Sequence, residues 1–281
     1  MAVNHLIDRL EISERRACRI TGQSRSTQRR LPIMADQELE LRSWLVAFAK
    51  QRPRYGYRRA HAIARKTGFM VNRKRVQRIW REEGLKVPHK ATKRSRTGSS
   101  DTDPKRLKAE YANHVWAIDY QDDQTADGRR LRYLNIVDEF TREVLAVEVA
   151  RSITADKTVE VLEELIETRG LAPDFIRSDN GPEFTSHALA DWCRLSGTGA
   201  AFIEPGSPWQ NPYVESLNGR LRDELLNQEL FFTLLEAQML AEDWRTDHNK
   251  NHPHSALGML SPDEFAAIWR QRGTTTAVPT P

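Results

Sequence analysis

The chain has 281 residues, of which 39% are hydrophobic and 29% are charged, and this size and composition indicate one large or two smaller globular domains. No segment approaches the roughly 20 uninterrupted apolar residues of a membrane span, and the charged N-terminus is not typical of a signal peptide. We therefore expect no membrane association and a cytoplasmic location. The two cysteines, Cys18 and Cys193, exclude a disulfide framework and are expected to be free and buried.

Charge is distributed unevenly along the chain. Residues 1–110 carry 28 Lys and Arg against 11 Asp and Glu, whereas residues 111–281 carry 15 against 28. A basic segment joined to an acidic one is typical of proteins that bind a polyanion through one end. Double-stranded DNA is therefore the expected partner, and the alternative is a surface whose charge merely happens to be uneven.

Residues 1–85 are expected to form a small all-α region of helix-turn-helix character. Residues 12–30 fit two short helices separated by a Thr-Gly turn, with Ser24 capping the second. Residues 41–50 are apolar and helical, and a second pair of helices follows the sequence Arg-Pro-Arg-Tyr-Gly-Tyr at 52–57. Asn72 is a suitable N-cap for a helix whose packing face comprises Val76, Ile79, Trp80 and Glu83.

The helix after Asn72 has a second, cationic face. Because Lys74, Arg78 and Arg81 recur at helical spacing, they are expected to line one side of it. If this face lies against DNA, most of its contacts would be to phosphates, which position a protein on DNA without reading the base sequence. The alternative is a solvated basic surface. The residues expected to bind DNA here are Arg73, Lys74, Arg75, Arg78 and Arg81.

Residues 86–110 lack apolar periodicity and are rich in Ser, Thr, Lys and Arg, so they are expected to form a basic flexible linker. The pattern then changes to strands at 115–120, 131–137 and 144–149, with a turn at Asp127-Gly128. A helix from Thr154 to Gly170, a strand at 175–178, a helix at 186–196 and a strand at 200–203 follow. This order predicts an α/β fold in which a mixed five-stranded sheet has flanking helices. The core is expected over 111–270, and 271–281 as a disordered tail.

Three carboxylates stand where neutral side chains would be expected. Asp119 lies within an apolar strand, Asp179 directly follows a buried strand, and Glu215 lies in the first turn of a helix that Asn211 is expected to cap. Three hard oxygen ligands suit Mg²⁺ or Mn²⁺, and two such ions would support in-line phosphoryl transfer. Taken singly, such residues are more often turn residues or complements of a helix dipole. Glu215 shares its helical stripe with Asn218 and Arg222, which would therefore face the site and are expected to contact DNA.

These motifs resemble the second-frame (OrfB) transposases of insertion-sequence-three-type bacterial elements, members of the DDE transposase and retroviral integrase superfamily. The resemblance rests on the acidic trio, on Ser178-Asp-Asn-Gly-Pro-Glu-Phe184, and on the closing sequences His252-Pro-His-Ser-Ala-Leu-Gly258 and Ser261-Pro-Asp-Glu-Phe265. Arg52-Pro-Arg-Tyr-Gly-Tyr57 and residues 71–79 resemble the helix-turn-helix that precedes the core in this family. The resemblance therefore covers nearly the whole chain.

The resemblance implies a ribonuclease-H-like core that holds two divalent ions at Asp119, Asp179 and Glu215. The implied reaction frees a 3'-hydroxyl at an element end by hydrolysis and then joins that end to another DNA. Arg222 and Asn211 match positions that contact DNA in the superfamily. The resemblance further implies a homo-oligomer, at least a dimer on DNA in the bacterial nucleoid, and a probable upstream-frame (OrfA) product or fusion as partner.

The chain departs from the family pattern near its end. The closing motif usually has Tyr-Asn before it and Arg-Pro-His within it, and here His248 and His252 replace the Tyr and the Arg. Zinc at these histidines or at His254 is not expected, because no cysteine lies within reach. Two other functions stay open, a catalytically silent DNA-binding regulator derived from a transposase and a nuclease that acts on RNA:DNA hybrids.

Overall fold

The structure is a computed structural model that describes residues 2–29, 36–87, 107–179, 187–202 and 211–275. It forms two compact units, Met1–Lys50 and Gln51–Pro281. We expected instead one helical region over 1–85. The division falls earlier because residues after Lys50 contact the C-terminal part of the chain, where Arg52 bonds to Asp247 and Tyr55 to His252.

The first unit contains three short helices, α1 (Ala2–Leu10), α2 (Glu14–Thr21) and α3 (Arg25–Gln28). Val3, Ala17 and Cys18 form its small core. The expected Thr-Gly turn is confirmed, because Gly22 ends α2 in the left-handed conformation at φ 69°. The expected cap is also confirmed, because Ser24 Oγ accepts a hydrogen bond from the Thr27 amide. The helix before residue 12 was not expected from the sequence.

Helix α4 (Asp36–Gln51) spans the division between the units, and α5 (Tyr57–Lys66) and α6 (Arg73–Glu82) follow it. Asn72 caps α6 as expected, since its Oδ1 accepts from the Arg75 amide at 2.8 Å. Val76, Ile79 and Trp80 are buried, but Glu83 is exposed because α6 ends at Glu82 and Glu83 only caps it. The two helices contact each other and form the second helical pair predicted for this region.

The sheet has the order β3-β2-β1-β4-β5, which is the ribonuclease-H-like arrangement. β1 pairs with β2, and β2 with β3, in antiparallel register, whereas β4 runs parallel to β1, and β5 runs parallel to β4. The five strands are β1 (Val115–Gln124), β2 (Arg130–Asp138), β3 (Val144–Ala150), β4 (Phe175–Ser178) and β5 (Gly199–Phe202). The expected mixed sheet is confirmed, and β1 lies at its centre.

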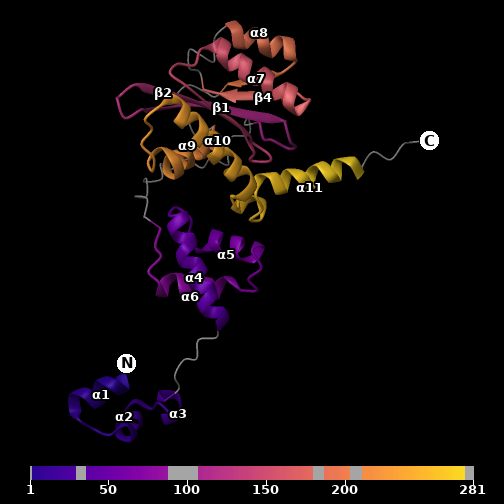
Figure 1. Cartoon of the computed structure of the whole chain (residues 1–281). Coiled ribbons are helices and arrows are strands. Elements are labelled where there is room, and N and C mark those ends of the chain that lie inside the picture. The colour runs from indigo at the N-terminus through magenta and orange to yellow at the C-terminus, as the bar shows by residue number, and fades with distance from the viewer. Residues whose placement is uncertain (1, 30–35, 88–106, 180–186, 203–210, 276–281) are drawn as a thin grey trace. The chain divides into compact units, whose positions relative to one another are not determined.

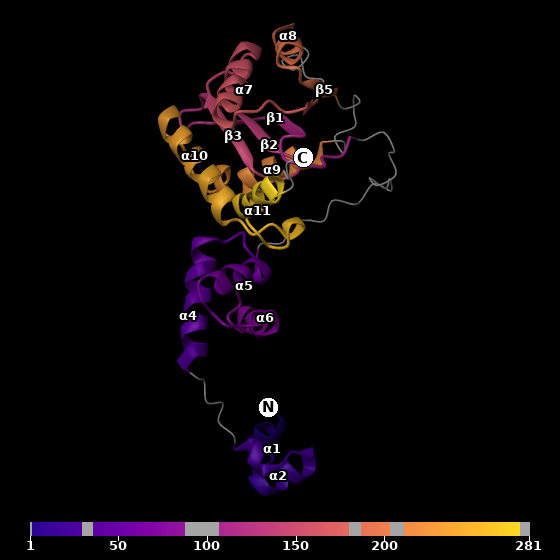
Figure 2. The same cartoon turned by 90° about the vertical axis from the view of Figure 1, so that its right-hand side faces the viewer.

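Helices cover both faces of this sheet. Figures 1 and 2 show α7 (Ala155–Arg169) and α8 (His187–Ser196) on one face and α9 (Pro212–Leu221) and α10 (Leu234–Asn251) on the other. Two hydrophobic clusters correspond to these layers: Trp116, Ile118 and Leu162 belong to the cluster under α7, and Ala117 and Leu217 to the one under α9. Adjacent residues of β1 therefore fill opposite cores, as strand geometry requires.

Local signals fix the ends of several core elements. Thr154 caps α7, and Gly170 ends it at φ 73°, both as expected. Asn211 occupies the N-cap position of α9 and Pro212 its first turn, both as expected, but the buried Asn211 side chain makes no capping hydrogen bond. A π-helical turn, η2 (Arg222–Leu226), continues α9. The cysteines are free and buried, as predicted.

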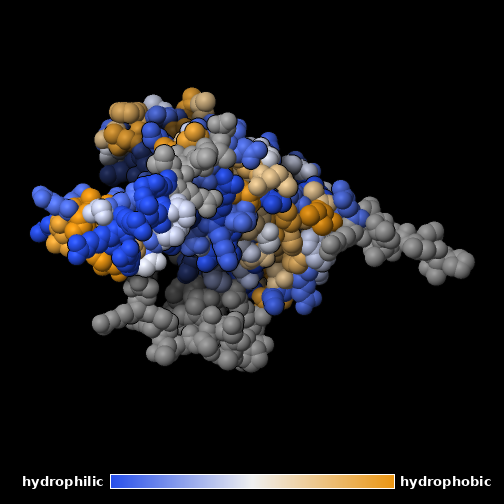
Figure 3. All heavy atoms as spheres, turned by 90° about the horizontal axis from the view of Figure 1, so that it is seen from below, coloured by the Kyte–Doolittle hydropathy of each residue, from blue (hydrophilic) through white to orange (hydrophobic). Residues whose placement is uncertain are grey.

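The C-terminal part contains the short 3-10 helix η3 (Ser255–Leu257) and the helix α11 (Pro262–Thr275). Because α11 reaches Thr275, the expected disordered tail from 271 is wrong for 271–275, and the rest of that tail lies outside the described residues. Most of the expected linker, 88–106, also lies outside them. Figure 3 shows hydrophobic residues at the surface on the right-hand side of the view. Helix α11 exposes Trp269. No described helix is long and apolar enough to cross a membrane.

Candidate active site

Asp119 stands on the central strand of the sheet. It lies opposite Asn135 in the antiparallel register of β1 and β2, and its side chain is partly buried. Its Oδ1 accepts a 2.8 Å hydrogen bond from the Tyr120 amide. The strand therefore presents a carboxylate of fixed orientation in a region whose neighbouring residues, such as Ile118, are fully buried.

Two asparagines hold the other oxygen of this carboxylate. Nδ2 of Asn218, on α9, donates to Asp119 Oδ2 at 2.7 Å. Oδ1 of Asn218 accepts from Nδ2 of Asn135, also at 2.7 Å, and Asn135 is fully buried on β2. This chain of hydrogen bonds ties the helix of Glu215 to the central strand, and it assigns Asn218 a contact to Asp119. The role of Asn135 follows only from the sheet register, and no sequence pattern points to this residue.

The parallel pairing of β1 and β4 brings Asp179 to the same edge of the sheet. Ala117 pairs with Arg177, and continuing that register by two residues sets Asp119 beside Asp179, just past the end of β4. Arg177 anchors this strand: its side chain is 3% exposed and bonds both oxygens of the fully buried Glu139 at 2.7 and 2.9 Å. Sequence reasoning missed this ion pair because its two residues lie on different elements.

Glu215 lies in the first turn of α9, and both it and Asp179 are exposed. The trio interacts electrostatically. The pKa of Asp119 is raised to about 6, mainly by burial and also by the charges of Asp179 and Glu215, while the hydrogen bonds from the Tyr120 amide and Asn218 oppose this shift. A carboxylate destabilised by burial and by two like charges is one that a bound cation would stabilise. Oxygen ligands of this kind fit Mg²⁺ or Mn²⁺.

Known protein families match the helical region and the sheet region of the chain. Integrase core domain families match residues 109–208 and 196–262, and an HTH-like domain family matches 35–93. The chain is 41% identical to the insertion element IS407 uncharacterized 31.7 kDa protein of Burkholderia multivorans, over 96% of the chain and 95% of that protein. The chain belongs to the DDE transposases of the insertion-sequence-three type.

Two further insertion-element proteins are similar to the chain. An insertion element IS476 protein of Xanthomonas euvesicatoria is 37% identical over 99% of the chain and 79% of its own length. Transposase InsD for insertion element IS2D of Escherichia coli is 30% identical over 76% of the chain and 73% of its own length. The magnesium-bound HTLV-2 integrase catalytic core domain is 18% identical over 57% of the chain, with a TM-score of 0.44.

The helical part of the transposase places the expected basic residues on α6. Arg73, Lys74, Arg78 and Arg81 are exposed, and Arg75 is half-buried. Arg78 pairs with Glu82 at 3.0 Å within the helix. The cationic face predicted from helical spacing is therefore present, and DNA binding by it stays a prediction.

Of the three other expected DNA contacts, Asn218 is hydrogen-bonded to Asp119, and DNA binding by it stays a prediction. The other two differ in accessibility. Arg222 begins η2, is exposed, and donates from Nη2 to the backbone carbonyl of Asp122 on β1 at 2.9 Å. Asn211 is only 4% exposed, and its Oδ1 has no hydrogen-bond partner among the described residues. A DNA contact by Asn211 remains a prediction that would require its side chain to leave this buried position.

Proposed function

We propose that this transposase cleaves and joins DNA phosphodiesters at the ends of an insertion sequence, using divalent metal ions held by Asp119, Asp179 and Glu215. One observation carries the proposal: the partly buried carboxylate of Asp119 is oriented by Asn218 and interacts with the charges of both other members of the trio. A partly buried carboxylate beside two like charges is costly without a cation, and groups perturbed in this way are typical of functional sites.

The chain's own residues would prepare this site before substrate arrives. Asn218 and the Tyr120 amide fix Asp119, and the anchored strand β4 delivers Asp179 beside it. When bound, two divalent ions would supply activation of the attacking oxygen and stabilisation of the leaving one. The preorganised carboxylates would therefore need little rearrangement during the reaction.

DNA is the proposed partner, bound through the basic N-terminal part of the chain. Insertion of an element requires its two ends to be held together by the protein, so we propose at least a dimer on DNA. The proposed assembly also includes the product of an upstream reading frame.

The test is joining of a labelled element end to plasmid DNA in Mg²⁺ by the full chain. Asp119→Asn, Asp179→Asn and Glu215→Gln should each lower the joining rate by at least about 100-fold, because charge stabilisation in the transition state is lost. Asp243→Asn, a change of an exposed acid outside the trio, is the matched control and should join normally. Wild-type protein that binds the end but never cuts or joins it would instead indicate a silent regulator.

A further inference from the structure

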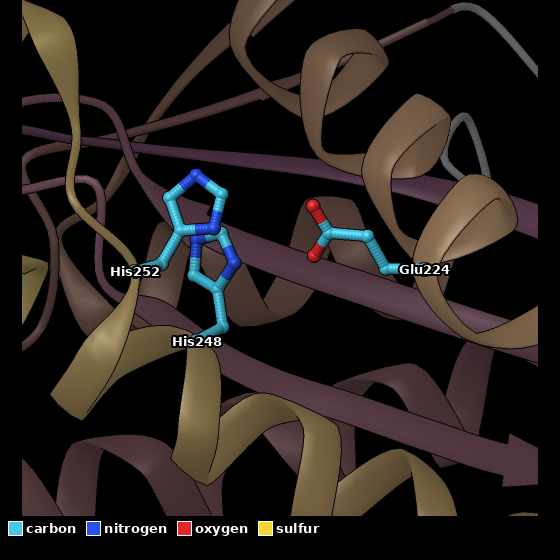
Figure 4. A group of neighbouring side chains, drawn as sticks. All are labelled: Glu224, His248 and His252. Atoms are coloured by element: carbon cyan, nitrogen blue, oxygen red, sulfur yellow. The ribbon is translucent and has the colours of Figure 1, made fainter. Parts of the chain in front are cut away.

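Glu224, His248 and His252 form a second group of potential metal ligands. Glu224 lies in η2, His248 in the last turn of α10, and His252 directly after that helix. Within the described part of the chain, one ligand atom from each of these residues lies within 4.8 Å of the other two. Figure 4 shows the Glu224 carboxylate directed toward the two imidazole rings, which stack with 4.5 Å between centroids.

Both histidines are deeply buried, and each carries a ring nitrogen to which no described residue bonds. His248 is 2% exposed and His252 fully buried, and neither Nδ1 of His248 nor Nε2 of His252 has a hydrogen-bond partner among the described residues. A buried polar atom without a partner is costly in a protein core. A stacked pair that served only to fill space would leave both atoms unsatisfied, whereas a bound cation would satisfy them.

Tyr55 orients one of these rings from outside the group. Its hydroxyl lies 2.7 Å from Nδ1 of His252, which leaves Nε2 as the nitrogen available to a metal. Tyr55 is itself 3% exposed, and the guanidinium groups of Arg52 and Arg59 lie 5.2 and 4.9 Å from the centre of its ring. Metal-binding histidines usually have their second nitrogen hydrogen-bonded in this way.

The surrounding charges favour neutral imidazole rings. Burial, followed by the charge of Arg220, holds the pKa of His248 well below its usual range. Arg59 lies 3.9 Å from a Glu224 oxygen. Because these two arginines would also repel a cation, we expect weaker binding than at a site built from cysteine thiolates.

We propose that Glu224, His248 and His252 bind one divalent transition-metal ion of the zinc class, in a structural site separate from the acidic trio. Imidazole and carboxylate ligands suit zinc better than magnesium. Zinc bonds of about 2.0–2.2 Å place tetrahedral ligands about 3.4 Å apart, so the three side chains would move closer by about 1 Å, with water as the fourth ligand. The ion would join η2 to the end of α10 and, through Tyr55, to the segment before α5.

The sequence argued against zinc here because no cysteine lies near these histidines. The structure instead supplies a carboxylate from η2, which no sequence spacing indicates. The two histidines also occupy the two positions where the chain departs from the closing motif of its family. The double variant His248→Tyr/His252→Arg, which restores that motif, is therefore expected to fold and to lack the site.

The experiment uses the full chain, stripped with a chelator and kept in excess Mg²⁺ so that the acidic trio is occupied. Zinc is then added and the zinc content is measured after dialysis, and the absorption spectrum is recorded after Co²⁺ is added to a second sample. Wild-type protein should retain one zinc ion per chain, with an increase in melting temperature. Glu224→Gln and the motif-restoring double variant should bind zinc at least about 10-fold more weakly, and Tyr55→Phe should weaken binding by about 10-fold.

Two controls separate this site from other zinc binding. His187→Gln removes an exposed histidine, and Asp119→Asn removes a member of the trio, so both should leave zinc affinity and the increase in melting temperature unchanged. The proposal is overturned if wild-type protein retains no zinc. It is equally overturned if Glu224→Gln and the double variant bind zinc as wild type does.

Discussion

The side-chain amide of Asn218 donates a 2.7 Å hydrogen bond to Oδ2 of Asp119. This contact joins α9, which carries Glu215, to the central strand of the sheet. The same amide group accepts from the fully buried Asn135, so the orientation of Asn218 is fixed: its NH₂ group must face the carboxylate. Asn218 is therefore a positioning residue for the acidic trio.

Replacing Asn218 should impair the reaction more than folding. Asn218→Ala removes a hydrogen bond to a charged group, which is worth about 1.5–3 kcal/mol, and we expect joining to slow by about 10- to 100-fold. Asn218→Asp adds a fourth carboxylate and should shift the Mg²⁺ dependence of joining, which a change that only loosened the fold would not do. Asn227→Ala, at an exposed asparagine, is the control. Joining by Asn218→Ala at the wild-type rate would contradict the positioning role.

Asp119 should destabilise the metal-free protein at neutral pH. Its folded pKa of about 6 lies above the unfolded value of 3.8, so between these values the folded state binds a proton that the unfolded state has released, and stability falls as pH rises. Asp119→Asn cannot ionise. It should match wild type near pH 4 and become more stable by up to about 3 kcal/mol above pH 6.

Urea denaturation at pH 4, 6 and 8 in a chelator measures this difference. Adding Mg²⁺ at pH 8 should stabilise wild type and leave Asp119→Asn nearly unaffected, because an ion at the site would offset the like charges. A stability difference that did not depend on pH would show that the Asp119 carboxyl titrates normally.

The sequence predicted the elements whose signals are local. Thr154 and Gly170 delimit α7 because a cap and a left-handed glycine act within one turn, and the trio stood out because Asp119 interrupts an apolar strand. Contacts between distant segments could not be predicted in this way. Asn135 meets Asn218 only through the sheet register, and His252 meets Tyr55 only when the two segments pack together.

Removing one charge from the buried pair of Arg177 and Glu139 should destabilise the fold more than removing both charges. Arg177→Met leaves the fully buried Glu139 carboxylate without its partner, and breaking such a pair costs about 3–5 kcal/mol. The double variant Arg177→Met/Glu139→Leu removes both charges and should recover most of that loss. Chemical denaturation of wild type, Arg177→Met and the double variant measures how much stability is recovered. Equal destabilisation by the single and double variants would contradict the prediction.

The exposed cations of α6 should account for part of the salt dependence of DNA binding. Each phosphate contact contributes a slope of about -0.9 in a log-log plot of affinity against salt concentration. Lys74→Ala/Arg81→Ala should therefore reduce the steepness of this plot by about 1.8. Lys157→Ala/Arg194→Ala, the same residue types on the acidic part of the chain, is the matched control. An equal change in both variants would mean that the α6 face is only a solvated surface.

Arg222 should position substrate beside the trio without taking part in the chemistry. Its guanidinium is exposed, bonds the Asp122 carbonyl, and has the side-chain oxygen of Gln121 within 3.0 Å of Nε when that amide is turned toward it. These contacts hold the charge at the end of α9, within reach of a DNA phosphate bound at the carboxylates.

Arg222→Ala should weaken binding of an element end and lower the salt slope by about 0.9. Arg222→Lys, which keeps the charge but not the fork of donors, should retain the slope and lose part of the affinity. Because an exposed arginine contributes little to folding, Mg²⁺ affinity and melting temperature should stay at wild-type values in both variants. End binding measured at two salt concentrations decides the matter, and unchanged binding and joining by Arg222→Ala would assign Arg222 to the solvated surface.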